Sequence, residues 1–377
     1  MTEASRGAAD DFAPADLAAP VVLRRRPMVL VTGGSGFLGA NLADRLAASG
    51  ERVLIYDNLS RPGVVQNLEW LQHRHGHRVE TAIADVRDEA ALRETTRQAS
   101  AVFHLAAQVA SSIDEAVADF EINARGTLNV LEAVRNRPDP PPLVFASTSR
   151  IYGEPFDPAS LVELERRYRP AHGEPQAIDE ACPLALSSPY ARSRGAADQY
   201  VLDYARAYRL RSVALRMSSL YGPRQFGVEG QGWIAHFLIR ALQGRPVTIF
   251  GNGKQVRDLL YVDDAVDALL RARARIDALA GQACNLGGGL ANTVSPLELL
   301  ARLSGLGIAS PPVRFAAAGP GDQLYYVSDT SKFERRTGWR AHTPVSVGLR
   351  NLQRWLIASG VAHAESKQEP EMAKVPA

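Results

Sequence analysis

The sequence predicts an α/β protein in which a doubly wound parallel sheet is followed by a smaller α/β lobe. Three observations support this fold class. Short runs of β-branched and aromatic residues alternate with longer segments of helical spacing through the first half of the chain. A glycine-rich turn follows the first of these runs directly. After residue 216 the alternation gives way to a loop-rich and glycine-rich stretch, which indicates that a second unit begins there.

The expected sheet comes from six strand-like runs, and the segments between them have helical spacing, as in Leu38–Leu46. Strands separated by helices in this way are parallel and are covered on both faces. A further helix is expected near Asp263–Leu279. Another begins at Ser295, a capping serine followed by a proline and, three residues on, by a glutamate. The predicted strands are Met28–Thr32, Arg52–Asp57, Val79–Asp85, Ala101–Leu105, Leu143–Ser147 and Ser212–Arg216.

The composition excludes several classes of protein. Of the 377 residues 46% are hydrophobic, so a full-sized core is available. With 43 basic and 41 acidic residues the net charge is only +2, which gives no electrostatic reason to expect a nucleic-acid partner. No uncharged apolar run reaches the roughly 18 residues of a membrane span, and two cysteines make a poor disulfide framework. We therefore expect a cytoplasmic protein without a membrane partner.

One bias stands out within the charged residues. Only four of the 43 basic side chains are lysines, which leaves 39 arginines. In a chain that uses arginine so heavily, an arginine in place of an expected lysine is informative. An arginine missing from an expected position is informative as well.

The turn after the first strand has the spacing of a dinucleotide-binding loop. Gly33 allows a tight turn, Gly36 lets the backbone approach a pyrophosphate, and Gly39 lets the helix pack closely on the strand. Asp57 ends the next strand, where its carboxylate can accept hydrogen bonds from both ribose hydroxyls and would repel a 2′-phosphate. The sequence therefore predicts a Rossmann-type domain that binds NAD rather than NADP. Asp85, at the end of the third strand, is expected either to reach the adenine edge or only to cap its strand.

These patterns divide the chain into a Rossmann domain, a second lobe and two ends of low periodicity. The expected parts are a flexible leader (1–27), an NAD-binding domain (28–216, with returning segments near 257–286), a substrate-binding lobe (217–256 and 287–360) and a flexible tail (361–377).

From Met28 to Trp355 the chain resembles the extended short-chain dehydrogenase/reductase superfamily. The resemblance implies that Tyr190 is the base that removes a hydroxyl proton and that Thr148 hydrogen-bonds the reacting oxygen. Arg194 stands where the superfamily has a lysine that assists the tyrosine and holds the nicotinamide ribose. The motifs that carry the resemblance are the glycine turn, His104-Leu105-Ala106-Ala107, Asn123 with Gly126-Thr127, Ser147-Thr148-Ser149 before Ile151-Tyr152-Gly153, Tyr190 with Arg194, and Arg257-Asp258.

Within the superfamily the chain is similar to the CDP-paratose 2-epimerase family, also called CDP-tyvelose 2-epimerases. The similar stretches include Asp57–Arg61, Ser218–Gly222, which contains Ser219, and Gly251–Asp258. This similarity implies oxidation at C2 of a sugar nucleotide by bound NAD, exposure of the other face of the 2-keto intermediate, and return of the hydride. Relatives of this kind usually dimerise through two helices, which implies a homodimer through Ser111–Arg135 and Tyr190–Tyr208.

The resemblance also assigns binding residues. The implied substrate contacts are Ser149, Ser219, Arg224, Gln225 and Arg257. The implied cofactor contacts are Gly33, Gly36, Phe37, Leu38, Asp57, Asn58, Asp85, Val86, Leu105, Ala106, Ala107, Tyr190 and Arg194. No metal site is expected, because the histidines at positions 73, 75 and 77 lie in a segment without nearby carboxylate or thiol ligands.

The chain departs from the family pattern in a way that bears on the substrate. Relatives usually carry arginines that clamp the substrate diphosphate, whereas here the corresponding segment has Ala318, Gly319 and Leu324. A charge-assisted hydrogen bond is worth roughly 1.5–3 kcal/mol, so two lost contacts matter for a diphosphate. The substrate is therefore either a nucleoside or nucleoside monophosphate, or a CDP-hexose that nearby arginines bind instead.

Two other functions stay open from the sequence. A net oxidoreductase would release the keto product rather than return the hydride. Arg194 also leaves room for a non-catalytic NAD(H)-binding sensor, because a planar guanidinium does not have the geometry of an ammonium. At about 6 Å and an effective dielectric of about 20, however, either cation stabilises a phenolate by roughly 2–3 kcal/mol.

Overall fold

The computed structural model describes residues 27–109, 115–171, 176–319 and 322–362. The predicted leader, except residue 27, and the tail from residue 363 lie outside these ranges, as does the start of the predicted dimer helix at Ser111.

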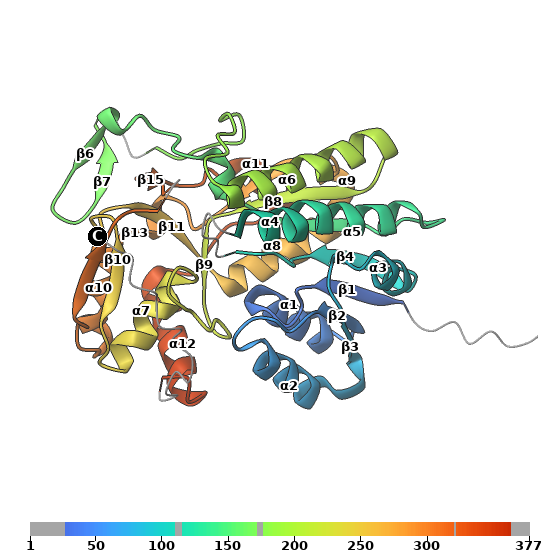
Figure 1. The fold of residues 1–377 in the computed structure, drawn as a ribbon, viewed down its shortest axis with the longest axis horizontal. Helices are drawn as coiled ribbons and strands as arrows, with labels where there is room; N and C mark the ends of the chain where they lie inside the picture. The colour runs from blue at the N-terminus through green and yellow to red at the C-terminus, as the bar shows by residue number, and fades with distance from the viewer. Residues whose placement is uncertain (1–26, 110–114, 172–175, 320–321, 363–377) are drawn as a thin grey trace, which may run out of the picture.

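A seven-stranded parallel sheet forms the larger part of the molecule and confirms the predicted fold class (Figure 1). All six predicted strands are present with shifts of one or two residues at their ends, and a seventh joins them from the second half of the chain. In spatial order the strands are β12 (Ala283–Leu286), β8 (Ser212–Met217), β5 (Leu143–Thr148), β4 (Ala99–His104), β1 (Met28–Thr32), β2 (Val53–Asp57) and β3 (Val79–Ile83).

Helices cover both faces of this sheet (Figure 1). Successive residues of β1 explain why, because Val29 and Val31 enter one hydrophobic cluster and Met28 and Leu30 enter the other. One face carries α1 (Phe37–Ala48), α2 (Val64–His75) and α8 (Val262–Ala274), and the other carries α3 (Glu89–Thr96), α5 (Gly126–Arg135) and α6 (Pro189–Tyr208).

The helix predicted over Asp263–Leu279 is divided in two. Arg275 leaves the helical region with φ −113° and ψ 24°, between α8 and α9 (Ile276–Leu279). The break lets Ile276 and Leu279 both turn into the core. This detail is absent from the sequence pattern, because Arg275 is neither a glycine nor a proline.

The smaller lobe contains short strands and helices. Its central strand is β11 (Val256–Tyr261), which pairs with β9 (Ser219–Tyr221), β13 (Thr293–Val294) and β15 (Tyr325–Tyr326). Two more pairs are β10 (Val247–Phe250) with β14 (Val313–Ala316) and β6 (Leu161–Glu163) with β7 (Tyr168–Pro170). Its helices include α7 (Trp233–Leu242), α10 (Pro296–Leu303) and α12 (Val345–Ala358), whereas α11 (Ser331–Thr337) packs on β12 of the large sheet.

The predicted start of α10 is confirmed in detail. The Ser295 hydroxyl accepts a hydrogen bond from the Glu298 amide at 3.1 Å, and the Glu298 carboxylate accepts one from the Ser295 amide at 3.0 Å. Such a reciprocal cap satisfies two backbone donors at once.

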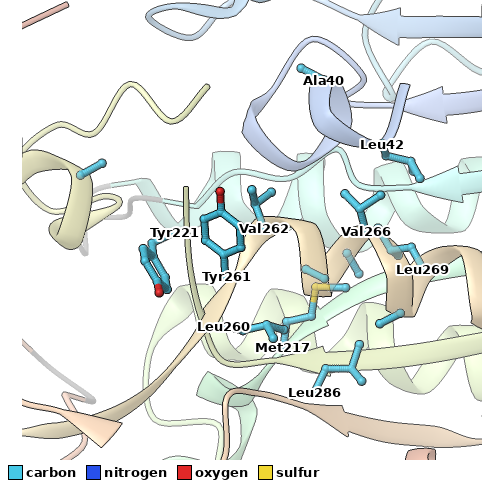
Figure 2. Packing of buried hydrophobic residues seen from close by; sticks show 14 of the residues in the cluster. Ala40, Leu42, Met217, Tyr221, Leu260, Tyr261, Val262, Val266, Leu269 and Leu286 are labelled. Carbon is cyan, nitrogen blue, oxygen red and sulfur yellow. The ribbon is translucent and has the colours of Figure 1, made fainter. Parts of the chain in front are cut away.

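One hydrophobic cluster runs from the large sheet into the lobe. Figure 2 shows Ala40 and Leu42 of α1 above Val262 and Val266 of α8, with Leu260 on the strand that leads into that helix. Because β11 belongs to the lobe and α8 packs on α1, this continuous core fixes the two parts against each other.

Candidate active site

The glycine turn between β1 and α1 brings two backbone segments into contact. Gly33 has φ +67°, and a Cβ atom there would lie 2.8 Å from the Cα of Ala106, at the end of β4. A Cβ on Gly39 would lie 2.2 Å from the Gly33 carbonyl oxygen. Only glycine fits at either position, so the turn stays compact, and the start of α1 is where an anion would be favoured.

Asp57 closes this turn from the neighbouring strand. Its carboxylate accepts hydrogen bonds from the Ser35 amide at 3.0 Å and from the Leu59 amide at 2.9 Å. Burial raises the pKa of the Asp57 carboxyl, and these backbone hydrogen bonds oppose that rise. The carboxylate therefore stands beside the glycine turn, where ribose hydroxyls of a dinucleotide would reach it.

Asp85 makes the contacts of a strand-end cap. Its carboxylate accepts hydrogen bonds from the Arg87 side chain at 2.8 and 2.9 Å and from the Asn58 amide nitrogen at 2.8 Å. The Arg87 hydrogen bond is the main reason that the pKa of Asp85 falls to about 2. Contact with an adenine stays a prediction. The structure does join Asp85 to Asn58, another predicted cofactor residue.

A series of hydrogen bonds, each with a defined donor, fixes the end of β4. Leu105, Ala106 and Ala107 follow directly after it. His104 is fully buried, with Nδ1 2.7 Å from the Thr32 hydroxyl and Nε2 2.9 Å from the Thr127 hydroxyl. Thr127 donates its own proton to the Asn123 carbonyl at 2.6 Å, so His104 Nε2 is the donor to Thr127. Burial, followed by the nearby Arg194, lowers the pKa of His104 to about 3, which keeps the ring neutral.

Thr148 is oriented to donate a hydrogen bond. It ends β5 and caps the short helix η4 (Ser149–Tyr152), and its hydroxyl oxygen accepts a hydrogen bond from the Arg150 amide at 3.2 Å. Because that amide occupies an acceptor position, the hydroxyl proton can point toward a reacting oxygen.

Tyr190 lies in the first turn of α6, which packs against β5 and η4. The Ser188 hydroxyl caps this helix by accepting a hydrogen bond from the Ala191 amide at 3.1 Å. Ser193 donates to the Tyr190 carbonyl at 3.0 Å and accepts from the Asn123 amide at 3.0 Å. The start of α6 is thus held against the segment that follows β4.

Arg194 is buried on the same face of α6 as Tyr190, with 3% of its surface exposed. One of its terminal nitrogens, Nη2, donates to the Ala146 carbonyl, and its guanidinium carbon lies 4.7 Å from the centre of the Phe145 ring. Nε and Nη1 are also buried, without a hydrogen-bond partner among the described residues. Burial lowers the pKa of Arg194, and the charges of the nearby Tyr190 and Asp198 oppose this. Arg194 is also close enough to Tyr190 for a side-chain hydrogen bond, and its contact with a nicotinamide ribose stays a prediction.

A cation that the sequence analysis did not assign also faces this region. Arg61 is partly buried, and burial lowers its pKa against the opposing effects of Tyr190, Glu115 and Asp57. Its guanidinium contacts the Gln231 side chain of the lobe and lies 3.4 Å from Gln108 Oε1. Arg61 therefore connects the β2–α2 loop to the segment after β4 and to the smaller lobe. The only sequence signal for Arg61 is that it belongs to the stretch Asp57–Arg61, which resembles the epimerases.

The predicted substrate residues lie in separate parts of the site. Ser149 and Arg257 lie together with the segment before β15, because Gln323 Nε2 donates to the Ser149 carbonyl at 3.4 Å and Arg257 Nη2 lies 2.8 Å from the Asp322 carboxylate. The Arg224 guanidinium instead lies 3.5 Å from the centre of the Trp70 ring.

Two further predicted substrate residues lie in and just after β9. Gln225 is buried and donates to the Leu220 carbonyl at 3.2 Å, and Ser219 begins the strand.

The cluster around Arg257 was not anticipated as a unit. Asp322 also contacts Arg150 at 3.2 Å, and Glu154 accepts a hydrogen bond from the Leu324 amide at 2.5 Å. Burial, followed by the neighbouring Arg150, lowers the pKa of Arg257 to about 10. Two cations and two carboxylates therefore meet between η4 and the lobe.

Within the described ranges no three potential ligands come together as a metal site. None of the helices there is long and apolar enough to cross a membrane.

The parallel sheet and the glycine turn with its strand-end carboxylate are those of an extended short-chain dehydrogenase/reductase. More narrowly, the chain belongs to the NAD-dependent epimerase/dehydratase family, whose model matches residues 29–287. The family description and the fit of the turn confirm the prediction of NAD as the cofactor.

Relatives along nearly the whole described chain agree with this assignment. A CDP-paratose 2-epimerase of Salmonella typhi is 38% identical over 87% of this chain and 98% of its own length. A dTDP-glucose 4,6-dehydratase of Neisseria gonorrhoeae is 30% identical over 87% of this chain and 95% of its own. Among solved structures, the UDP-glucose 4-epimerase of Thermus thermophilus in complex with NAD is 32% identical. It superimposes with a TM-score of 0.73, covering 88% of this chain and 99% of that one. The homologues are thus sugar-nucleotide epimerases and dehydratases.

Proposed function

We propose that the protein is an NAD-dependent epimerase of a sugar nucleotide or related nucleotide, and that it inverts C2 through a 2-keto intermediate. The observation that carries the proposal is the segment after Thr148, which reads Ser149 and Arg150. Dehydratases of this superfamily have an acidic pair there to drive elimination. The similarity to a CDP-paratose 2-epimerase supports the same choice.

The side chains divide the chemistry between them. Tyr190 removes the proton of the reacting hydroxyl, and Thr148 donates a hydrogen bond to its oxygen. Arg194 supplies a fixed positive charge that favours the ionised tyrosine, and its guanidinium would hold the nicotinamide ribose. A bound NAD would supply the hydride acceptor and donor that the two steps need. Return to the opposite face inverts the carbon, and Tyr190 gives the proton back.

A second candidate acts on a nucleoside or nucleoside monophosphate. The observation in its favour is the segment of Ala318, Gly319 and Leu324, where related enzymes have arginines. Leu324 offers only its amide, which donates to the partly buried carboxylate of Glu154.

One experiment separates these candidates. The purified protein is incubated with CDP-paratose, with related sugar nucleotides, and with adenosine and its monophosphate, and products are identified by NMR. We expect a 2-epimer of a sugar nucleotide, loss of turnover in Tyr190→Phe, and no accumulation of NADH. Stoichiometric NADH would indicate a net oxidoreductase. No conversion of any compound, together with unchanged ligand responses in Tyr190→Phe, would indicate a sensor.

We also propose a homodimer through the face formed by α4 (Ala116–Asp119) and α6. Val117 and Phe120 on this face are 77% and 56% exposed. A surface hollow beside them is lined by Ala116, Phe120, Pro189, Arg192, Ser193 and Ala196. Light scattering should show a dimer that Phe120→Glu dissociates. Ile83→Glu, at a 68% exposed site on β3, should leave it intact.

A further inference from the structure

We propose that Arg61 is a positioning residue that keeps NAD in the protein between turnovers, because it ties the smaller lobe to both sides of the cofactor crevice. The proposal concerns the cofactor alone and does not depend on which substrate is epimerised. It assigns a role to a side chain outside the predicted cofactor and substrate residues.

The order of the strands locates the crevice at the end of β1. The chain runs from β1 through β2 to β3 on one side and then returns to β4 on the other side of β1. In a doubly wound sheet a dinucleotide binds beyond the carboxyl ends of the strands at such a reversal, which here lies next to the glycine turn. The loop after β2 and the segment after β4 therefore form the two sides of the crevice.

Arg61 contacts both sides of this crevice and the lobe. It follows Asp57 in the loop after β2, and its Nη2 donates to Gln108 Oε1, in the segment after β4, at 3.4 Å. Its Nη1 donates to the side chain of Gln231 in the lobe. One guanidinium thus joins three parts of the chain.

The backbones of both partners are held by hydrogen bonds of their own. The Gln108 amide donates to the Asn123 side chain at 2.9 Å, and that side chain donates back to the Gln108 carbonyl at 3.0 Å. Gln231 closes a tight turn with Val228, in which the amide of each residue donates to the carbonyl of the other at 3.0 Å. Both partners are therefore fixed attachment points for the Arg61 guanidinium.

The lobe segment that leads to this turn lies directly on the loop that carries Arg61. A Cβ atom on Gly63 would lie 2.1 Å from the Phe226 ring, so the ring contacts the backbone of the loop. In the helix that follows the loop, Asn67 Nδ2 donates to the Arg224 carbonyl at 3.2 Å. This packing holds the lobe on the β2 side of the crevice, and Arg61 links it across to the β4 side.

The consequence concerns the release of the cofactor. A dinucleotide bound in the crevice would have to leave between the two sides that Arg61 joins. Release therefore has to wait until the contacts of Arg61 open, so these contacts slow the dissociation of NAD. Slow dissociation suits a reaction that restores its cofactor in every turnover.

The test measures the release of NAD in the absence of substrate. The holoprotein is loaded with isotope-labelled NAD and mixed with excess unlabelled NAD, and the label that stays bound is followed by mass spectrometry after gel filtration. In Arg61→Gln and in Gln231→Ala we expect release to be about tenfold faster. The double variant should release NAD no faster than Arg61→Gln alone, because both changes break the same contact.

Two further variants serve as controls. Arg61→Lys keeps the charge but not the planar fork that reaches two partners, so its release rate should lie between those of the wild type and Arg61→Gln. Arg97→Gln, at a 72% exposed arginine of the Rossmann domain, makes the same charge change and should release NAD like the wild type. The melting temperature of each apoprotein verifies that the variant is folded.

Three results would overturn the proposal. The first is complete release from the wild type within the time of the gel filtration, and the second is an unchanged rate in Arg61→Gln. The third is faster release in Arg61→Gln but not in Gln231→Ala, because Arg61 would then act on the cofactor directly. A protein that epimerises nothing but releases NAD as expected would contradict the proposed function and leave this inference intact.

Discussion

Replacing Arg194 with methionine should separate the catalytic role of its charge from the cost of burying it. The guanidinium is 3% exposed, and two of its three nitrogens have no partner within the described chain. Methionine has a similar length and no charge. We expect the variant to bind NAD more weakly, to lose turnover at neutral pH and to be more stable without ligand.

The magnitudes follow from the geometry. Tyr190 and Arg194 are four residues apart on one helix, so their charges lie about 6 Å apart. At an effective dielectric of about 20 the interaction is worth about 3 kcal/mol, or roughly a hundredfold in turnover at neutral pH. For stability, an unpaired buried charge costs several kcal/mol. The hydrogen bond to Ala146 and the contact with Phe145 offset part of this, so we expect the variant to gain about 1–2 kcal/mol.

The assay is the pH dependence of kcat, combined with urea unfolding of the apoprotein. Removing the cation disfavours the ionised base, so the acid limb of the profile should move about two pH units upward in Arg194→Met. Arg194→Lys keeps the charge and should leave the limb within half a unit. An unmoved acid limb, or an apoprotein destabilised by methionine, would refute the role given to this charge.

Three further predictions concern the framework of the site. Gly39→Ala should abolish NAD binding in a fluorescence titration, because its Cβ would meet a carbonyl oxygen at 2.2 Å, whereas Gly305→Ala, with open space around it, should bind normally. His104 has a pKa near 3 when folded and about 6.5 when unfolded, so stability falls as pH drops below 6.5. Between pH 7 and 5 this group should cost about 2 kcal/mol, and the pH dependence in His104→Gln should be smaller by that amount. Asp198→Ala should lower the free energy of unfolding by about 3–5 kcal/mol, because it leaves Arg216 buried without the carboxylate that lies 2.8 Å from it. A loss below about 1 kcal/mol, as for a solvent-exposed ion pair, would contradict this.

Local patterns in the sequence predicted the elements that depend on local physics. The turn at Gly33 needs a positive φ and a close backbone approach, and only a few residue spacings satisfy both. The cap at Ser295 similarly depends on residues three apart. The alternation of strand-like runs with helical segments predicted the two covered faces of the sheet, because parallel neighbours are joined by crossover helices.

The polar cluster at the substrate end could not be predicted in the same way. Arg150, Arg257 and Asp322 come from three segments far apart in the chain, and no spacing rule relates them. The sequence did show that arginines were missing between Ala318 and Leu324, but not which other arginine reaches that place. Likewise, nothing local indicated that Arg224 would stack on Trp70.

The most direct test of the proposed C2 epimerisation follows the hydrogen on the reacting carbon. The wild-type protein is given a sugar nucleotide deuterated at C2 in ordinary water, and the epimer is analysed by NMR and mass spectrometry. Hydride transfer and return within one closed site predict that the deuterium stays on C2 of the inverted product, with no net NADH. Loss of the label to solvent, or inversion at another carbon with C2 untouched, would contradict the account.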